Sequence, residues 1–154
     1  MPDTLPPHLR PITFAANELL LDLLYLLQSY CKQDLESVAI LLCVTDATMR
    51  PFMTGGPVAP EVLVAERPSE AIRGAISRRM IADKTGLSRE TVRRKTLELA
   101  EAGFVLIDGN DRVRSAQNLG DPAFQHAVES GHGAVLRYLQ RLNSFGVPLD
   151  CVRT

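Results

Sequence analysis

The sequence predicts a mainly α-helical protein with one small β-hairpin, and three observations lead to that fold class. Leucine and alanine recur at helical spacing in long segments near both ends of the 154-residue chain. In the middle, two short segments that each begin with serine are separated by a glycine, which is typical of two helices joined by a tight turn. Residues 105–114 then alternate apolar and polar side chains around an Asp-Gly turn, which predicts two antiparallel strands.

The composition is that of a folded globular protein without a membrane segment. Hydrophobic residues make up 45% of the chain and charged residues 23%, values that exclude a disordered or low-complexity protein. The densest apolar run, Leu19 to Leu27, is much shorter than the roughly 18 residues that a membrane span needs, and it contains Asp22. The N-terminus lacks the basic, apolar and small-residue pattern of a signal peptide. We therefore expect a cytoplasmic protein.

Cysteine and histidine do not form a pattern that indicates a metal or redox site. Cys31, Cys43 and Cys151 are an odd number of widely spaced thiols, so free cysteines in a reducing compartment are expected, with Cys31 and Cys43 in the core. The three histidines are scattered and have no cysteine or carboxylate at ligand spacing. Nucleophile, phosphate-loop and dinucleotide motifs are also missing, so we expect neither an enzyme nor a cofactor.

The N-terminal region, residues 1–68, is expected to contain two helices and a linker. Residues 14–31 are rich in leucine on more than one face, which predicts burial on several sides. A dimer interface is the leading interpretation of this helix, with a monomer core or an effector pocket as alternatives. Residues 34–49 predict a second helix begun by an Asp34 cap, although a strand remains possible there. The four prolines and the Gly-Gly pair of residues 51–68 predict a linker.

The C-terminal region, residues 119–154, is expected to contain a helix or a broken pair of helices. Asp121-Pro122 is a strong start signal, with Asp as the cap and Pro at the first helical position. Gly131 and Gly133 mark the point where the helix is most easily broken. This region is the second candidate for a dimer interface.

The central region, residues 69–118, predicts a winged helix-turn-helix. A short helix is expected to open at Ser69, before one capped by Ser77 and ended by Gly86, which supplies the positive φ of a tight turn. Ser88 would cap a second helix that ends at Gly103, with an inward face at helical spacing: Val92, Thr96 and Leu99. In this fold the second helix fits the major groove of duplex DNA, and the hairpin, or wing, lies along the neighbouring backbone.

Charge along the chain agrees with a polyanionic partner for the central region. The net charge of the whole chain is −1, but residues 73–114 hold ten basic side chains against six acidic ones. Basic side chains occur on all three parts of the expected motif: Arg78 and Arg79 on the first helix, Arg89, Arg93, Arg94 and Lys95 on the second, and Arg112 and Arg114 on the wing.

The segment Ser88 to Arg94, SRETVRR, resembles the start of the recognition helix in the catabolite-activator (Crp/Fnr) family. The resemblance covers about 40 of the 154 residues and implies a bacterial DNA-binding domain. Residues before position 70 do not resemble the cyclic-nucleotide domain of that family, so no effector is implied. The general winged pattern is also shared by MarR-like and GntR-like regulators.

The resemblance implies roles for individual residues in a complex with DNA. Arg89, Glu90 and Arg94 match the family positions that contact base edges, and Arg93 stands where a small residue is common. We therefore expect base contacts from Arg89, Glu90, Arg93 and Arg94. Contacts to the DNA backbone are expected from Arg78, Arg79, Ser88, Thr91, Lys95, Arg112 and Arg114. The expected function is sequence-specific binding to double-stranded DNA by a homodimeric transcriptional regulator; the alternative is a winged helix that binds only proteins.

Overall fold

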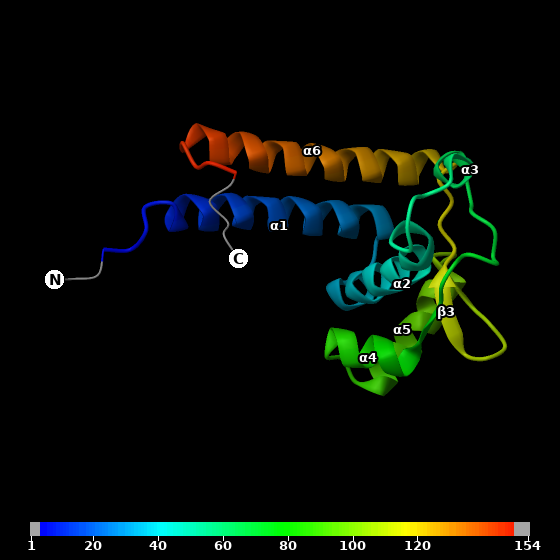
Figure 1. Ribbon diagram of the computed structural model, residues 1–154. Helices are drawn as coiled ribbons and strands as arrows, with labels where there is room; N and C mark the ends of the chain where they lie inside the picture. The colour runs from blue at the N-terminus through cyan, green and yellow to red at the C-terminus, as the bar shows by residue number, and fades with distance from the viewer. Residues whose placement is uncertain (1–3, 150–154) are drawn as a thin grey trace.

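The protein consists of a rounded head and a long two-helix arm (Figure 1). The structure is a computed structural model, and it describes residues 4–149. The arm is formed by α1 (Leu9–Cys31) and α6 (Pro122–Ser144), which run antiparallel to each other. The head contains the remaining elements: α2 (Leu35–Met53), α3 (Pro60–Val64), β1 (Ile76–Ser77), α4 (Arg78–Thr85), α5 (Arg89–Glu101), β2 (Val105–Ile107) and β3 (Arg112–Ser115).

The hairpin expected from the sequence is present, and a third strand extends it into a small antiparallel sheet. The strand order is β1-β3-β2, with Ile76 opposite Val113 and Val105 opposite Ser115. The β1 strand is only two residues long, so it has no alternation that a sequence pattern could reveal. The mainly helical fold class with a small hairpin is confirmed.

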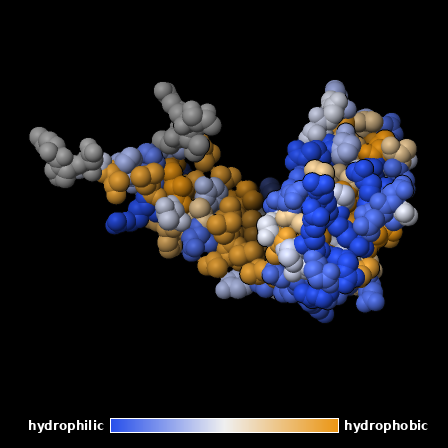
Figure 2. Space-filling view, turned by 90° about the horizontal axis from the view of Figure 1, so that it is seen from below, coloured by the Kyte–Doolittle hydropathy of each residue, from blue (hydrophilic) through white to orange (hydrophobic). Residues whose placement is uncertain are grey.

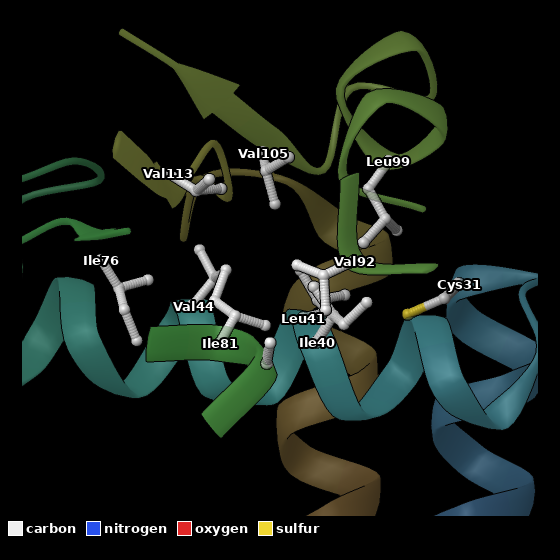
Figure 3. Packing of buried hydrophobic residues seen from close by; sticks show 11 residues of the cluster. Cys31, Ile40, Leu41, Val44, Ile76, Ile81, Val92, Leu99, Val105 and Val113 are labelled. Atoms are coloured by element: carbon white, nitrogen blue, oxygen red, sulfur yellow. The ribbon is translucent and has the colours of Figure 1, made fainter. Parts of the chain in front are cut away.

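The head has one hydrophobic core, to which both helices and strands contribute (Figure 3). Side chains from α2, α4, α5 and the sheet meet there, and the most deeply buried include Ile40, Val44, Ile81, Leu99 and Val113. Because α2 supplies part of this core, it belongs to the same folded unit as the helix-turn-helix. The expected boundary at residue 68 therefore does not separate two cores.

Helix α2 begins as the sequence indicates but ends later. Asp34 caps it, with the side chain accepting a hydrogen bond from the Ser37 backbone N–H at 2.9 Å, so the helical interpretation is right and the strand alternative is wrong. The helix continues through Pro51 to Met53. The region expected to be a linker, residues 51–68, therefore contains the last turn of α2 and also α3.

The prediction of a short helix that opens at Ser69 is wrong, because the chain forms a turn there and then enters β1. Ser69 Oγ accepts a hydrogen bond from the Ala71 N–H, but no helix follows. The segment after this turn packs closely on α2, where a Cβ on Gly74 would collide with the Ala47 carbonyl oxygen. The Gly74 N–H donates to the Thr48 carbonyl of α2 at 3.0 Å and therefore forms no bond within a helix of its own.

Both arm helices are longer or more regular than the sequence suggests. Helix α1 begins at Leu9 rather than near residue 14, because Pro11 lies in the first helical turn, where no intrahelical N–H bond is lost. Helix α6 begins at the expected Asp121 cap and is unbroken. Gly131 does not interrupt it, because the glycine lies where α1 comes close: a Cβ there would be 3.6 Å from Leu26.

The arm joins the head through aromatic contacts at its base. Tyr30 of α1 lies 5.9 Å, between ring centroids, from both Phe104 of the head and Phe124 of α6. The adjacent Cys31 is buried and Cys43 half-buried, both as unpaired thiols, and burial raises the pKa of each. Cys151 lies outside the described residues. Within residues 4–149, no helix is both long enough and apolar enough to cross a bilayer.

Candidate nucleic-acid interface

The turn between α4 and α5 has the geometry that the sequence predicts. Ser77 caps α4 by accepting a hydrogen bond from the Met80 N–H, and Ser88 caps α5 by accepting from the Thr91 N–H at 3.0 Å. Gly86 ends α4 with φ +73°, a left-handed conformation that favours glycine over side chains with a Cβ. Leu87 fills the corner by packing against the core of the head. These contacts fix the direction in which α5 leaves the turn.

One face of α5 is buried, and this decides which side chains point to solvent. Val92 and Leu99 are completely buried in the head core (Figure 3), and Thr96 lies between them along the helix. The Thr96 hydroxyl donates to the Val92 carbonyl at 2.7 Å, so it leaves no unsatisfied polar group inside. The inward face predicted from helical spacing is confirmed for all three residues.

The front half of the outward face of α5 is basic. Arg89, Arg93 and Arg94 are exposed there, together with one acidic side chain, Glu90. The second half of the outward face is acidic instead, because its exposed charged residues are Glu98 and Glu101. The positive charge is therefore concentrated at the N-terminal end of α5, where the helix dipole adds to it.

Two of these arginines form ion pairs within the helix. Arg93 binds Glu90 through two hydrogen bonds of 3.0 and 2.7 Å, and this contact lowers the pKa of Glu90. Arg94 lies 3.0 Å from Glu98. Exposed pairs of this kind contribute little to stability, so a phosphate or a base edge can replace the carboxylate at little cost. The structure gives no ion pair to Arg89 within residues 4–149.

Lys95 was expected to face the DNA backbone, but its side chain is only 3% exposed and does not point toward solvent. Its ammonium group forms ion pairs with Asp34, the cap of α2, and with Glu36 at 3.4 Å. The hydrogen bond from Lys95 lowers the pKa of Asp34 to about 2. Lys95 therefore ties α5 to the start of α2, and its ammonium group is not exposed on the outward face of α5.

The two hydroxyls at the start of α5 contact each other. Ser88 Oγ accepts the capping bond and donates to Thr91 Oγ1 at 2.9 Å. The hydroxyl of Thr91 keeps a hydrogen for which no acceptor is found in the described part of the chain. Thr91 can therefore donate to a phosphate, whereas Ser88 serves mainly as the cap.

The two arginines at the start of α4 differ in how firmly they are held. Arg79 is exposed, with no ion pair in residues 4–149. Arg78 is 19% exposed, and its Nη1 lies 3.2 Å from Asp111 Oδ1 in the hairpin turn. This contact places the tip of the hairpin beside the start of α4. Arg79 is thus available to a phosphate, and Arg78 mainly joins two parts of the head.

The hairpin turn is formed by Asp108-Gly109-Asn110-Asp111, as the sequence predicts. The Asp108 carboxylate accepts hydrogen bonds from the N–H groups of Asn110 and Arg112 at 2.9 and 3.0 Å. The left-handed residue of this turn is Asp111, with φ +60°, rather than Gly109.

The two arginines of the wing share one face of β3, where Arg112 is exposed and Arg114 half-buried. Arg112 donates to the Ala75 carbonyl at 2.7 Å, a bond that leaves other donors of its guanidinium group unused. Arg114 is bound by Glu70 and lies 3.7 Å from Asp108. The prediction that both contact DNA is supported by exposure for Arg112 only, because two carboxylates already neutralise Arg114.

Sequence reasoning missed the residues that hold these side chains in place. Asp34 was recognised only as a helix cap, and its partner Lys95 lies 61 positions away. Arg73 is buried, and its guanidinium donates to the Ser115 carbonyl and to Glu70. Contacts over such separations leave no periodic signal in a single sequence.

Other kinds of site find little support in the part of the chain that the structure describes. No group of three or more His, Cys, Asp or Glu side chains within residues 4–149 is arranged to hold a metal ion. Two open grooves lie on the arm, far from the basic end of α5; the first has a volume of about 510 Å³ and lies between α1 and α6. Comparison of the chain with protein-family models, with curated proteins and with solved structures found no match.

Proposed function

We propose that the protein binds double-stranded DNA in a sequence-specific manner and acts as a homodimeric transcriptional regulator. The observation that carries the proposal is the exposed cluster of Arg89, Arg93 and Arg94 at the free front of α5, in a helix-turn-helix followed by a wing. The resemblance of Ser88 to Arg94 to the recognition helix of the Crp/Fnr family supports the same proposal.

In this proposal α5 enters the major groove, which is wide enough to admit an α-helix. Arg89, Arg93 and Arg94 would reach guanine O6 and N7, the acceptors that a guanidinium group binds with two hydrogen bonds. Glu90 would accept from cytosine N4. Arg93 would exchange its two hydrogen bonds with Glu90 for bonds to the base, which frees the Glu90 oxygens to accept.

Contacts to the sugar-phosphate backbone would come from the edges of the same surface. Arg79, Arg112 and Thr91 have donors that face solvent, and contacts of this kind fix the position of α5 on the duplex without reading its sequence. Lys95 takes no part, and Arg78 and Arg114 would have to leave their carboxylate partners first. The electrostatic contribution to binding therefore comes from fewer side chains than the sequence suggests.

The test is a titration of the full chain with a random-sequence DNA duplex at several salt concentrations, followed by selection of bound sequences from a random pool. We expect salt-sensitive binding to random DNA and one enriched, two-fold symmetric sequence. The double variant Arg89→Ala/Arg93→Ala should bind both DNAs at least tenfold more weakly. The matched control is Arg50→Ala/Arg67→Ala, which removes two exposed arginines from other parts of the head.

A protein-binding winged helix is the second candidate, and the ion pairs on α5 favour it. Glu90 and Glu98 partly neutralise the arginines that DNA binding needs. If random duplex at low salt is not bound, or if the control variant weakens binding as much as the α5 variant, the DNA proposal is wrong and the protein-binding alternative takes its place.

A further inference from the structure

The arm is held together along a single seam, because it contains only two helices. Ala15 of α1 and Ala134 and Leu142 of α6 are buried in this seam, and Gly131 lets the two helices come close. Many apolar side chains of both helices remain outside it. In Figure 2 the arm is covered largely by hydrophobic side chains, whereas the visible surface of the head is mostly hydrophilic.

The two edges of the seam differ in charge. On the first edge, Asp22 binds Arg137 at 3.1 Å and Glu18 binds Arg141 at 2.8 Å, and the groove of about 510 Å³ lies beside these pairs. Leu21 lines this groove as well. A partner that covered this edge would have to remove water from four charged groups, so we call it the polar edge.

The second edge carries no Asp, Glu, Lys or Arg. It is located by Leu23, whose Cδ2 lies 4.0 Å from the position of a Cβ on Gly131. Helical spacing of three, four and seven residues extends it along both helices. We call it the apolar edge and define it by six side chains, three from each helix: Leu20, Leu23, Leu27, Val128, Val135 and Leu139. Leu20 is 60% exposed, Val128 51% and Val135 40%.

We propose that the apolar edge is the surface on which a second copy of this chain docks, forming a four-helix bundle from two arms. Two helices of 23 residues form a face about 35 Å long and about 18 Å wide, or roughly 600 Å² per copy. A standard stable interface buries about 800 Å² per partner, so this face is close to the size that a dimer needs.

A second copy fits this edge better than a charged partner does. The apolar edge offers no charged group for recognition, so its occupant must present an equally apolar helical face, and an identical arm does so. This inference rests on the homodimer of the proposed function and adds the surface on which the two copies meet. It can be tested without DNA, so its failure is distinguishable from failure of DNA binding.

Adjacent leucines on α1 provide a matched pair of variants. Leu20 shares its side of α1 with Leu23 and Leu27, whereas Leu21 shares its side with Glu18 and lines the polar groove. Both are exposed, at 60% and 42%, so glutamate at either position leaves the folded monomer intact. The mass of the full chain should be measured by sedimentation equilibrium between about 1 and 50 μM.

We expect the wild-type chain and Leu21→Glu to sediment at twice 16.9 kDa, and Leu20→Glu to sediment as a monomer with a dissociation constant raised at least 100-fold. Val135→Glu, on the other helix of the same edge, should give the same result as Leu20→Glu. Circular dichroism of each variant checks that its helix content is unchanged. A monomeric wild-type chain overturns the proposal, as does a dimer that survives both Leu20→Glu and Val135→Glu.

Discussion

The head and the arm differ in how completely they bury their apolar side chains. In the head, α2, α4, α5 and the sheet enclose residues such as Ile81 and Leu99 completely, and the buried cations Arg73 and Lys95 are paired with acidic side chains. In the arm, two helices cover each other along one seam and leave Leu20 and Val135 in solvent. The head can therefore be stable as one chain, whereas residues 4–149 leave an apolar surface of the arm uncovered.

The largest expected effect is the contrast between a leucine of the head and one of the arm. Leu99→Ala empties a fully buried position and should lower the free energy of unfolding by about 2–5 kcal/mol at any protein concentration. Leu20→Ala should cost less than about 1 kcal/mol in dilute solution and more as the concentration rises, because dimerisation then contributes. Urea unfolding at two protein concentrations measures both. Equal effects from both variants would remove the distinction between head and arm.

The next prediction compares the loss of each partner of the ion pair between Asp34 and Lys95. Asp34→Ala removes a helix cap and leaves the buried Lys95 ammonium with Glu36 alone, so we expect a loss of about 2–3 kcal/mol. Lys95→Met places an apolar chain in a buried position and leaves Asp34 in contact with water, so the loss should stay below about 1 kcal/mol. Both are measured by urea unfolding. A larger loss in Lys95→Met would contradict the structural role assigned to the pair.

The third prediction concerns base recognition by α5. Arg94→Ala should weaken specific binding by about 1–3 kcal/mol per half-site and relax the preference at one base pair. The matched control is Arg50→Ala, since Arg50 is also an exposed arginine paired with an acid four positions away, but on α2. Binding is titrated over a set of operator variants. Uniform weakening over all bases would make Arg94 a phosphate contact.

The pH dependence of stability follows from the lowered pKa of Asp34. Lys95 holds this pKa at about 2, below its ordinary value near 4, so the pair stabilises the fold fully above about pH 4. Its contribution should disappear as the pH falls from about 4 to about 2. Because Asp34 is 61% exposed, solvent screening limits the effect to about 1 kcal/mol. Unfolding curves at pH 5, 3 and 2 should show this loss in the wild type and a smaller one in Lys95→Met, where the Ser37 N–H still favours the ionised Asp34.

The smallest expected effect belongs to the wing. Arg112→Ala removes one exposed guanidinium, so it should weaken binding to specific and random DNA alike and reduce the slope of log affinity against log salt by about 1. Lys95→Met should leave that slope unchanged, because Lys95 is buried. An unchanged slope in Arg112→Ala would exclude the wing contact.

Local signals in the sequence predicted the helix-turn-helix well, because its conformation depends on neighbouring residues. The caps at Ser77 and Ser88 and the left-handed Gly86 each depend on bonds or backbone angles within a few positions. The inward face of α5 followed from helical spacing. The same approach failed for Lys95, which looks like any other cation on a basic helix until its distant partner Asp34 is known.

The sequence by itself determined where the central helices begin and end, and which side of α5 is apolar, since these depend on hydrogen bonds and periodicity within single segments. Only the tertiary structure decided that α2 belongs to the head, that α1 pairs with α6, and which cations remain free. The physical reason is that packing and ion pairs depend on positions in space. A buried ion pair between distant elements, such as that of Lys95 with Asp34, withdraws a cation from the surface, whereas the exposed pairs within α5 do not.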